Sequence, residues 1–210
     1  MTVYPGVLVS DKKDFDARIA EFNGNVDGIH IDIADGIFVN NKTLSIDEIE
    51  KLPDGFFEAH LMVSDPVAYV SQCHALGFSR ILAHIDAFPD SNFEYALELQ
   101  EFVHMKDMQF GIVFQRGITI ENNEYLSKFD HAMIMTIDLG FSGQPFQEDQ
   151  LTQIARLRSF CPDLSIAADG HVDTITSPRI VESGATHLVS TSFLSGDEAM
   201  SRYSQLKGIT

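Results

Sequence analysis

A strand-then-helix rhythm runs along the whole chain and constrains the fold more than any other feature. Short runs rich in β-branched and aromatic residues are followed by polar turns and then by stretches whose apolar residues have helical spacing. Eight runs are expected to be strands: Val3–Val9, Gly28–Ile33, Phe57–Met62, Ile81–His84, Gln109–Phe114, Ala132–Ile137, Ser165–Asp169 and His187–Ser190. Strands that alternate with helices typically form a parallel sheet.

The intervening helices are expected to be amphipathic. A helix over 14–22 would place Phe15, Ile19 and Phe22 on one side, and a helix over 150–160 shows the same spacing. The sequence also marks helix starts. Ser45 with Glu48 three residues later resembles a capping box, and Asp65-Pro66 puts proline at a first helical position.

The length of 210 residues helps to decide which α/β fold the chain adopts. Eight strand–helix units leave about 26 residues each, near the lower limit of a (β/α)8 barrel and with no segment left for a second domain. We therefore predict an α/β fold, a single-domain (β/α)8 TIM barrel over residues 1–210. A doubly wound open sheet is the alternative, but the first strand leads into VLVSDKKD rather than a glycine-rich phosphate loop.

The net charge and the cysteine content indicate which classes of partner and which cellular compartment to expect. The net charge of −17 repels phosphodiester backbones and anionic lipid surfaces, so we expect neither nucleic acid nor membrane as a partner. The two cysteines, Cys73 and Cys161, fit no zinc, redox or disulfide pattern. The N-terminus does not resemble a signal peptide, and no apolar run approaches a membrane span. We predict a cytoplasmic protein.

Polar side chains end several of the predicted strands. They are His30 and Asp32, which share one strand face, then His60, His84, Asp86 and Asp169. The strand ends of a barrel meet at one rim, where buried imidazoles and carboxylates must satisfy one another or a cation. Two imidazoles with two carboxylates form a donor set that suits Zn²⁺, Fe²⁺ or Mn²⁺. His104 and His131 are expected to be structural.

Glycine and hydroxyl residues cluster after the late strands, in DLGFSGQPF, ADGH and STSF. Backbone N–H groups in such turns can hold a phosphate group with little help from cationic side chains. The alternative is that Gly140 and Gly143 only serve tight turns.

Over nearly the whole chain, these motifs resemble the ribulose-phosphate 3-epimerase family. The segments that carry the resemblance are HIDIADGIFVNN, AHLMVSDP, IMTIDLGFSGQPF, IAADGHV and HLVSTSF. The resemblance implies a ribulose-phosphate-binding type of barrel and an isomerase of carbohydrate metabolism and the pentose phosphate pathway. Its activity would convert D-ribulose 5-phosphate to D-xylulose 5-phosphate through an enediolate. It also implies a homo-oligomer, a dimer or larger.

The resemblance assigns roles to individual residues. It implies one divalent metal ion per chain, Zn, Fe(II), Mn or Co, held by His30, Asp32, His60 and Asp169, with Asp32 and Asp169 also acting as catalytic acid and base. Residues implied to bind substrate or its phosphate are Gly6, His60, Met62, Gly140, Phe141, Ser142, Gly143, Gly170, His171, Thr191 and Ser192.

The chain departs from the family pattern near the substrate. Gly6 stands where the family typically has a substrate-contacting serine, and Ser142, His171 and Thr191 replace glycines. Arg116 and Leu139 replace prolines. These changes keep two alternatives open: a 3-epimerase of a ketohexose 6-phosphate such as allulose 6-phosphate, and a non-catalytic sugar-phosphate-binding barrel.

A related group of phosphosugar decarboxylases uses an Asp-x-Lys-x-x-Asp motif. The second predicted strand contains Asp32 and Asp35 but no lysine between them, which argues against that chemistry.

Overall fold

Eight parallel strands close into a barrel in the computed structural model, which describes residues 1–141 and 143–209. The strands follow one another in chain order, and β1 pairs with β8 to close the sheet. Their bounds are β1 Thr2–Val7, β2 Ile29–Ala34, β3 Phe57–Met62, β4 Arg80–His84, β5 Gln109–Phe114, β6 His131–Met135, β7 Ser165–Asp169 and β8 His187–Ser190. The predicted (β/α)8 barrel is confirmed, and every predicted strand end lies within about two residues of the observed one.

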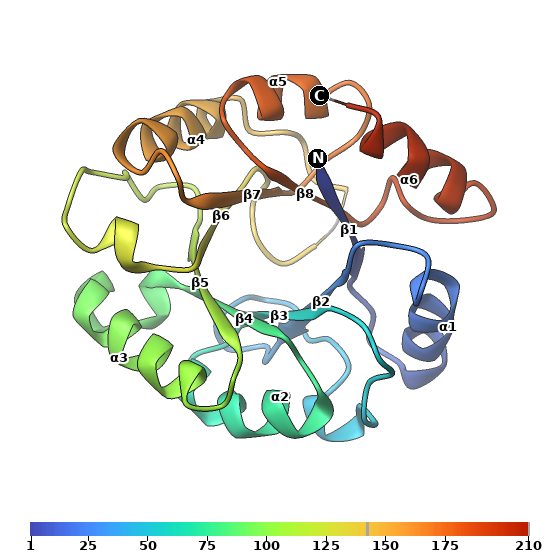
Figure 1. The fold of residues 1–210 in the computed structure, drawn as a ribbon. Helices are drawn as coiled ribbons and strands as arrows, with labels where there is room; N and C mark the ends of the chain where they lie inside the picture. Colours follow the sequence, from blue (N-terminus) through green and yellow to red (C-terminus); the bar gives the residue numbers. More distant parts are fainter. Residues whose placement is uncertain (142, 210) are drawn as a thin grey trace.

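Helices surround the barrel, as the view along it shows (Figure 1). They are α1 Lys12–Phe22, α2 Val70–Leu76, α3 Phe93–His104, α4 Asp149–Phe160, α5 Ser177–Glu182 and α6 Ala199–Lys207. Asp11 caps α1 by accepting a hydrogen bond from the Asp14 N–H. The apolar side of α1 is buried, as its spacing predicts. None of the helices in the described ranges is long and apolar enough to cross a membrane.

The helix start expected at Ser45 leads to only one 3-10 turn, Ile46–Glu48. The capping box forms, but Ile49 already has an extended backbone with ψ 124°, so the turn ends there. By contrast, Asp65-Pro66 does begin a helical segment. A 3-10 turn over Pro66–Tyr69 runs directly into α2.

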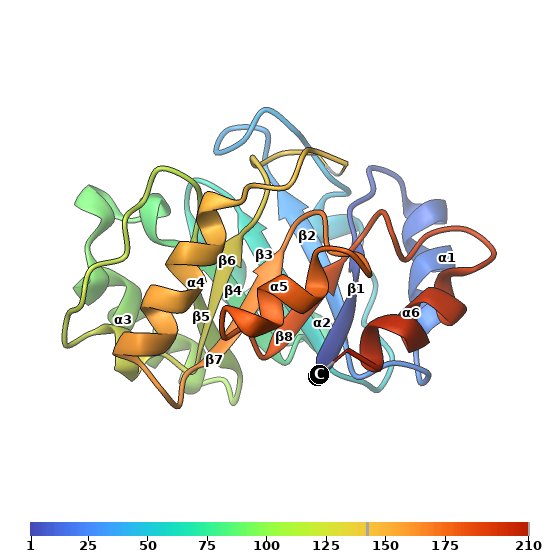
Figure 2. The same cartoon turned by 90° about the horizontal axis from the view of Figure 1, so that it is seen from above.

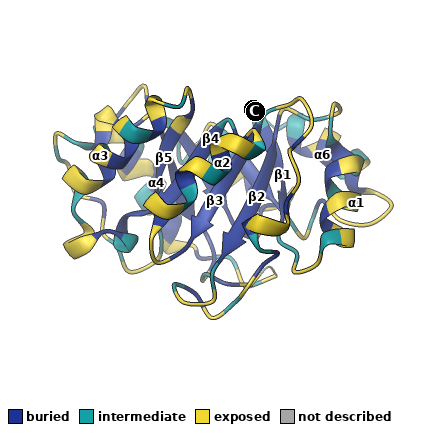
Figure 3. Cartoon of the chain, turned by 90° about the horizontal axis from the view of Figure 1, so that it is seen from below, coloured by how far each residue is buried: buried dark blue, intermediate teal, exposed yellow. Residues whose placement is uncertain are grey.

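Along each strand, successive side chains point alternately into the barrel and outward toward the helices. The largest core cluster packs the outer sheet face against the helices, and a separate inner cluster fills the barrel. The inner cluster contains Tyr4, Leu82, Val113, Met133, Met135, Ala167 and Val189. Figure 3 shows the strands as a buried layer inside partly exposed helices.

Two loops rise above the carboxyl end of the barrel. They follow β2 and β6, and they lie next to each other when the barrel is seen from its side (Figure 2). The Asn41 side-chain amide of the first loop donates a hydrogen bond to the Gly140 carbonyl of the second. The two loops therefore flank the end of the barrel at which the polar strand ends meet.

Candidate functional site

Four buried side chains converge at the carboxyl end of the barrel. His30 and Asp32 project from the same face of β2, Asp32 lies opposite His60 of β3, and Asp169 ends β7. One nitrogen or oxygen atom of each residue lies within 4.8 Å of the others. The structure thus brings together the four residues that were predicted to bind metal.

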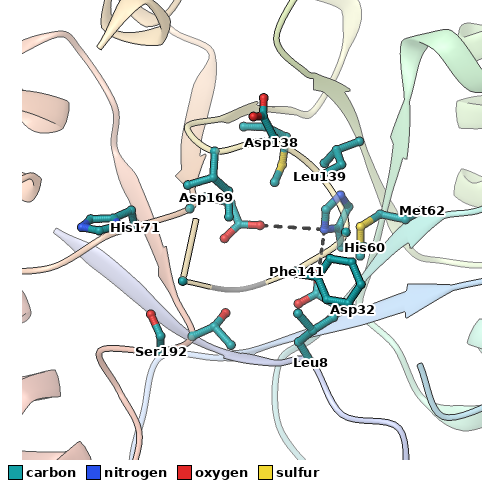
Figure 4. A pocket seen from close by; sticks show the side chains of 16 residues that line it. Leu8, Asp32, His60, Met62, Asp138, Leu139, Phe141, Asp169, His171 and Ser192 are labelled. Carbon is teal, nitrogen blue, oxygen red and sulfur yellow. Dashed lines mark hydrogen bonds and ion pairs between the residues drawn. The ribbon is translucent and has the colours of Figure 1, made fainter. Parts of the chain in front are cut away.

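The nitrogen and oxygen atoms of this cluster lie close enough to one another to bind a single cation. His60 Nδ1 lies 2.8 Å from Asp32 Oδ1 and 3.9 Å from Asp169 Oδ2, and the His60 and Asp169 side chains point toward one another (Figure 4). His30 Nε2 lies 3.4 Å from Asp32 Oδ1 and 3.8 Å from Asp169 Oδ2. This buried nitrogen has no hydrogen-bond partner among the described residues. An unpartnered imidazole nitrogen facing two carboxylates fits a divalent metal ion.

The pKa values of Asp169 and Asp32 are shifted in opposite directions. Burial raises the pKa of Asp169 to about 6, with the nearby Asp32 carboxylate contributing. Burial would also raise the pKa of Asp32, but His30 and His60 outweigh it and hold that pKa below its ordinary value. Two carboxyl groups whose pKa values are pushed apart are suited to act as acid and base in one reaction.

A second layer of buried polar groups supports His30. Its Nδ1 lies 2.7 Å from Glu58 Oε1, and the other Glu58 oxygen accepts a 3.0 Å hydrogen bond from Arg80 Nη1. Arg80 also donates to the side-chain oxygen of Gln109. Burial would raise the pKa of Glu58, but His30 and Arg80 outweigh it and lower that pKa to about 2. Sequence analysis missed Glu58, although its position two residues before His60 places both on one strand face.

His84, predicted at the rim, contacts the cluster from β4. His60 Nε2 lies 2.8 Å from His84 Nε2, so one of these nitrogens donates to the other. Burial and the neighbouring His60 hold the pKa of His84 well below its ordinary value, so His84 is neutral. If His60 Nδ1 binds a metal ion, His60 Nε2 carries the proton and donates a hydrogen bond to His84 Nε2. Asp86, which follows His84, is only partly buried.

A pocket opens above these side chains (Figure 4). Its wall contains Asp32, His60 and Asp169 together with predicted substrate-binding residues: Met62, Gly140, Phe141, Gly143, Gly170, His171, Thr191 and Ser192. Sequence analysis missed other wall residues, Leu8, Met135, Ile137, Asp138 and Leu139. Gly6 does not line the pocket, and Ser142 lies outside the described residues.

Three further histidines discussed from the sequence, His104, His131 and His171, lie outside the His/Asp cluster. His171 has a left-handed backbone, with φ 51°, and its Nδ1–H donates to the Gln144 carbonyl at 2.8 Å. It therefore ties the loop after β7 to the loop after β6. His104 ends α3 and lies 2.7 Å from Asp130, and His131 is buried and hydrogen-bonded to Ser165. Neither His104 nor His131 lines the pocket or belongs to the His/Asp cluster.

Solved structures with the same architecture have distant sequences. The 3-hexulose-6-phosphate synthase of Salmonella typhimurium matches with a TM-score of 0.72 and 10% identity, covering all of this chain (100%) and 98% of that one. The 3-keto-L-gulonate-6-phosphate decarboxylase of Vibrio cholerae matches with a TM-score of 0.68 and 11% identity, covering 99% and 96%. At these identities the similarity supports the fold alone.

Curated relatives are closer in sequence. The ribulose-phosphate 3-epimerase of Chlamydia pneumoniae is 32% identical over 178 residues, covering 80% of this chain and 76% of that protein. The ribulose-phosphate 3-epimerase of Bacillus subtilis is 27% identical over 204 residues, covering 92% of each. The model of the Ribulose-phosphate 3 epimerase family matches residues 2–195. With the barrel and its buried His/Asp cluster, these matches show that the chain belongs to the ribulose-phosphate 3-epimerase family, a family of isomerases.

Proposed function

We propose that the protein is a metal-dependent 3-epimerase that converts D-ribulose 5-phosphate to D-xylulose 5-phosphate. The observation that carries this proposal is the pair of buried carboxyl groups, Asp32 and Asp169, which line one pocket and lie beside the imidazoles of His30 and His60. Family membership supports the reaction type, and the curated relatives carry the name of this activity.

The two carboxyl groups would move protons at carbon 3 of the ketose. One carboxylate takes the proton next to the ketone, and the other carboxyl group returns a proton to the opposite face of the planar enediolate. The reverse reaction uses the same groups in exchanged roles. Asp169, with its pKa raised to about 6, and Asp32, with its pKa lowered, supply one acid and one base.

His30, Asp32, His60 and Asp169 would hold one divalent metal ion per chain. The mixed nitrogen and oxygen donors suit Zn²⁺, Fe²⁺, Mn²⁺ or Co²⁺. Such an ion, when bound, supplies positive charge that stabilises the negative charge developing on the substrate oxygens. The same two carboxyl groups then combine metal binding with proton transfer.

The phosphate would bind at the other end of the pocket. Gly140, Gly143 and Gly170 belong to the loops after β6 and β7, and Ser192 to the loop after β8. Backbone N–H groups in such loops bind anions without a cationic side chain, which suits a chain of net charge −17. Met62 would contribute an apolar wall, and Phe141 and His171 would cover the phosphate end.

Proton NMR of the reaction in deuterated water tests the proposed function. Metal-loaded protein incubated with ribulose 5-phosphate should give xylulose 5-phosphate with deuterium at carbon 3. Incorporation only with allulose 6-phosphate would keep the chemistry and move the activity to a ketohexose phosphate. Binding of both sugars without incorporation at any metal loading would show a non-catalytic barrel.

Asp169→Asn should reduce epimerisation by at least ~10²-fold, because it removes one acid/base group. The matched control is Asp163→Asn, which changes an exposed aspartate before β7 and should leave the rate unchanged. Metal content is measured for both variants, so that loss of the metal ion is separated from loss of the carboxyl group.

We also propose that the barrel over residues 1–210 acts as one unit, in the cytoplasm, as a homo-oligomer. Both cysteines are free and buried, which fits a reducing compartment. Light scattering coupled to size exclusion measures the oligomeric state, and a mass equal to one chain would contradict the proposal.

A further inference from the structure

Thr191 faces a glycine across the seam that closes the barrel. β1 and β8 pair with Pro5 opposite Ser190, which places Gly6 opposite Thr191, one residue beyond the end of β8. Gly6 lies opposite His30 on its other side. Because side chains alternate along a strand, Thr191 points into the barrel mouth, next to the strand that carries the cluster.

A side chain at position 6 would require Thr191 to move. A Cβ atom at residue 6 would lie 3.0 Å from Thr191 Cβ and 3.3 Å from Thr191 Cα, and closer still to Thr191 Oγ1. Rotation about χ1 of Thr191 moves Oγ1 but leaves Cβ and Cα in place. Gly6 does not have a left-handed backbone, so its conformation does not require glycine. Glycine at position 6 therefore lets Thr191 keep this position without a shift.

The Thr191 hydroxyl is available to a ligand. Thr191 lines the same pocket as Asp32, His60 and Asp169. The hydroxyl of the preceding Ser190 donates to a backbone carbonyl at 2.6 Å, whereas within residues 1–141 and 143–209 the Thr191 hydroxyl has no hydrogen-bond partner. A hydroxyl that lines a pocket and has no protein partner can bind a substrate oxygen.

We propose that the Thr191 hydroxyl hydrogen-bonds an oxygen at the reacting end of the bound sugar phosphate, and that Gly6 provides the space that admits it. The proposal rests on the proposed epimerase function and adds a substrate-positioning residue to it. One hydroxyl reaches this place from the end of β8, and a side chain from β1 could enter it only if Thr191 moved. Exchanging the side chains should therefore move the hydroxyl from one strand to the other.

Five variants test this coupling: Thr191→Val, Thr191→Ser, Thr191→Gly, Gly6→Ser and the double change Gly6→Ser with Thr191→Gly. Thr191→Val keeps the shape but loses the hydroxyl, so kcat/KM should fall about tenfold. Thr191→Ser should stay near wild type. Thr191→Gly and Gly6→Ser should each lower kcat/KM, and the double change should recover much of the loss, because serine at position 6 then enters the vacated space.

Binding affinity and activity are measured separately, so that failure of the Thr191 proposal can be distinguished from failure of the proposed epimerase function. Calorimetry with the equilibrium mixture of ribulose and xylulose 5-phosphates should show affinity changes in the same order as kcat/KM, at unchanged metal content. Thr152→Val, an exposed threonine of α4, is the matched control and should behave as wild type.

Equal activity and affinity of Thr191→Val and wild type would overturn the positioning role of Thr191. A double variant no better than the worse single one would overturn the coupling to Gly6. A wild-type protein that binds the sugar phosphate without exchange at carbon 3 would overturn the epimerase function, and the affinity series would still test Thr191. Absence of binding by wild type would overturn both.

Discussion

At the residue scale, the buried charge of Glu58 should have a large effect on the stability of the folded protein. Its side chain is fully buried between His30 and Arg80, and each of its oxygens has a partner. A buried ion pair adds little stability in total, but removing one partner leaves the other charge buried without compensation. When His30 loses one proton, as metal binding requires, the Glu58 carboxylate keeps the remaining proton on Nδ1. This leaves Nε2 free to face Asp32 and Asp169.

Glu58→Ala should lower the free energy of unfolding by about 3–5 kcal/mol, because Arg80 then remains buried and unpaired. Metal affinity should fall about 10–100-fold, because His30 loses its orienting partner. Urea unfolding and metal titration measure the two effects, with Glu182→Ala, an exposed glutamate at the end of α5, as control. Unchanged stability would show that Arg80 finds another partner.

The lowered pKa of Glu58 also predicts how the stability of the protein changes at acid pH. A carboxyl group whose pKa falls on folding stabilises the folded protein above its ordinary pKa of 4.5. That contribution should disappear as the pH falls from 4.5 through about 2. Glu58→Gln should therefore lose less stability than wild type over this range. Parallel stability curves for the two proteins would contradict the prediction.

Metal binding should release protons near neutral pH. Burial would lower the pKa of His30, but Asp32 and Glu58 outweigh it and hold that pKa well above its ordinary value in the metal-free protein. A metal ion needs the deprotonated nitrogen, so metal affinity should rise with pH. Calorimetry at pH 7 in two buffers with different ionisation enthalpies measures the proton release. Identical apparent enthalpies in both buffers would count against it.

At the scale of elements, the loops after β2 and β6 lie next to each other above the carboxyl end of the barrel (Figure 2). Phe141 is 54% exposed although it lines the pocket, so sugar-phosphate binding can bury it. The Asn41 amide already joins the first loop to the Gly140 carbonyl of the second. A loop that covers a bound substrate excludes water from the reacting carbon.

Hydrogen exchange measures this closure directly. Peptides containing Gly140 and Gly143 should exchange more slowly when the metal-loaded protein binds sugar phosphate. A peptide from the loop after β5, residues 115–124, serves as the internal control and should not change. Equal exchange of the β6 loop with and without ligand would indicate a rigid turn.

The end of β7 depends on a glycine that no other residue can replace without movement. Gly170 has φ 118°, and a Cβ there would lie 2.9 Å from the Ile137 amide nitrogen. Gly170→Ala should therefore destabilise the protein by roughly 1–3 kcal/mol and displace the adjacent Asp169. Thermal unfolding and metal titration measure both effects. Gly24→Ala is the control for backbone strain alone, because Gly24 has φ 78° with open space around it.

At the scale of the whole molecule, negative charge dominates the surface. Ion pairs at the surface, such as Lys12 with Asp16 and Arg202 with Glu198, use few of the 31 acidic residues. The remaining carboxylates repel one another in the compact state. The charge also favours binding of cations at the pocket over binding of polyanions.

Sodium chloride should therefore raise the thermal midpoint of the protein. Raising the ionic strength from about 0.01 M to 0.15 M shortens the screening length from roughly 30 Å to roughly 8 Å, which weakens the repulsion between distant carboxylates. Scanning calorimetry measures the midpoint at fixed pH and fixed metal loading. A midpoint that falls with salt would show that attractive ion pairs outweigh the repulsion.

The sequence by itself determined the barrel and the four residues of its buried His/Asp cluster. Strand and helix periodicities are local, so eight strand–helix units could be recognised without knowing which strands pair. The two-residue spacing of His30 and Asp32 placed both on one face of β2. Parallel strands end at one rim, so His60 and Asp169 could be expected beside them.

Only the tertiary structure decided contacts between residues far apart in the chain. The pairing of Glu58 with Arg80 and the close approach of Thr191 to Gly6 depend on strand register across the closed sheet. Register is set when the whole barrel packs, because a shift of one residue would exchange its inner and outer faces. No local pattern in the sequence contains that information.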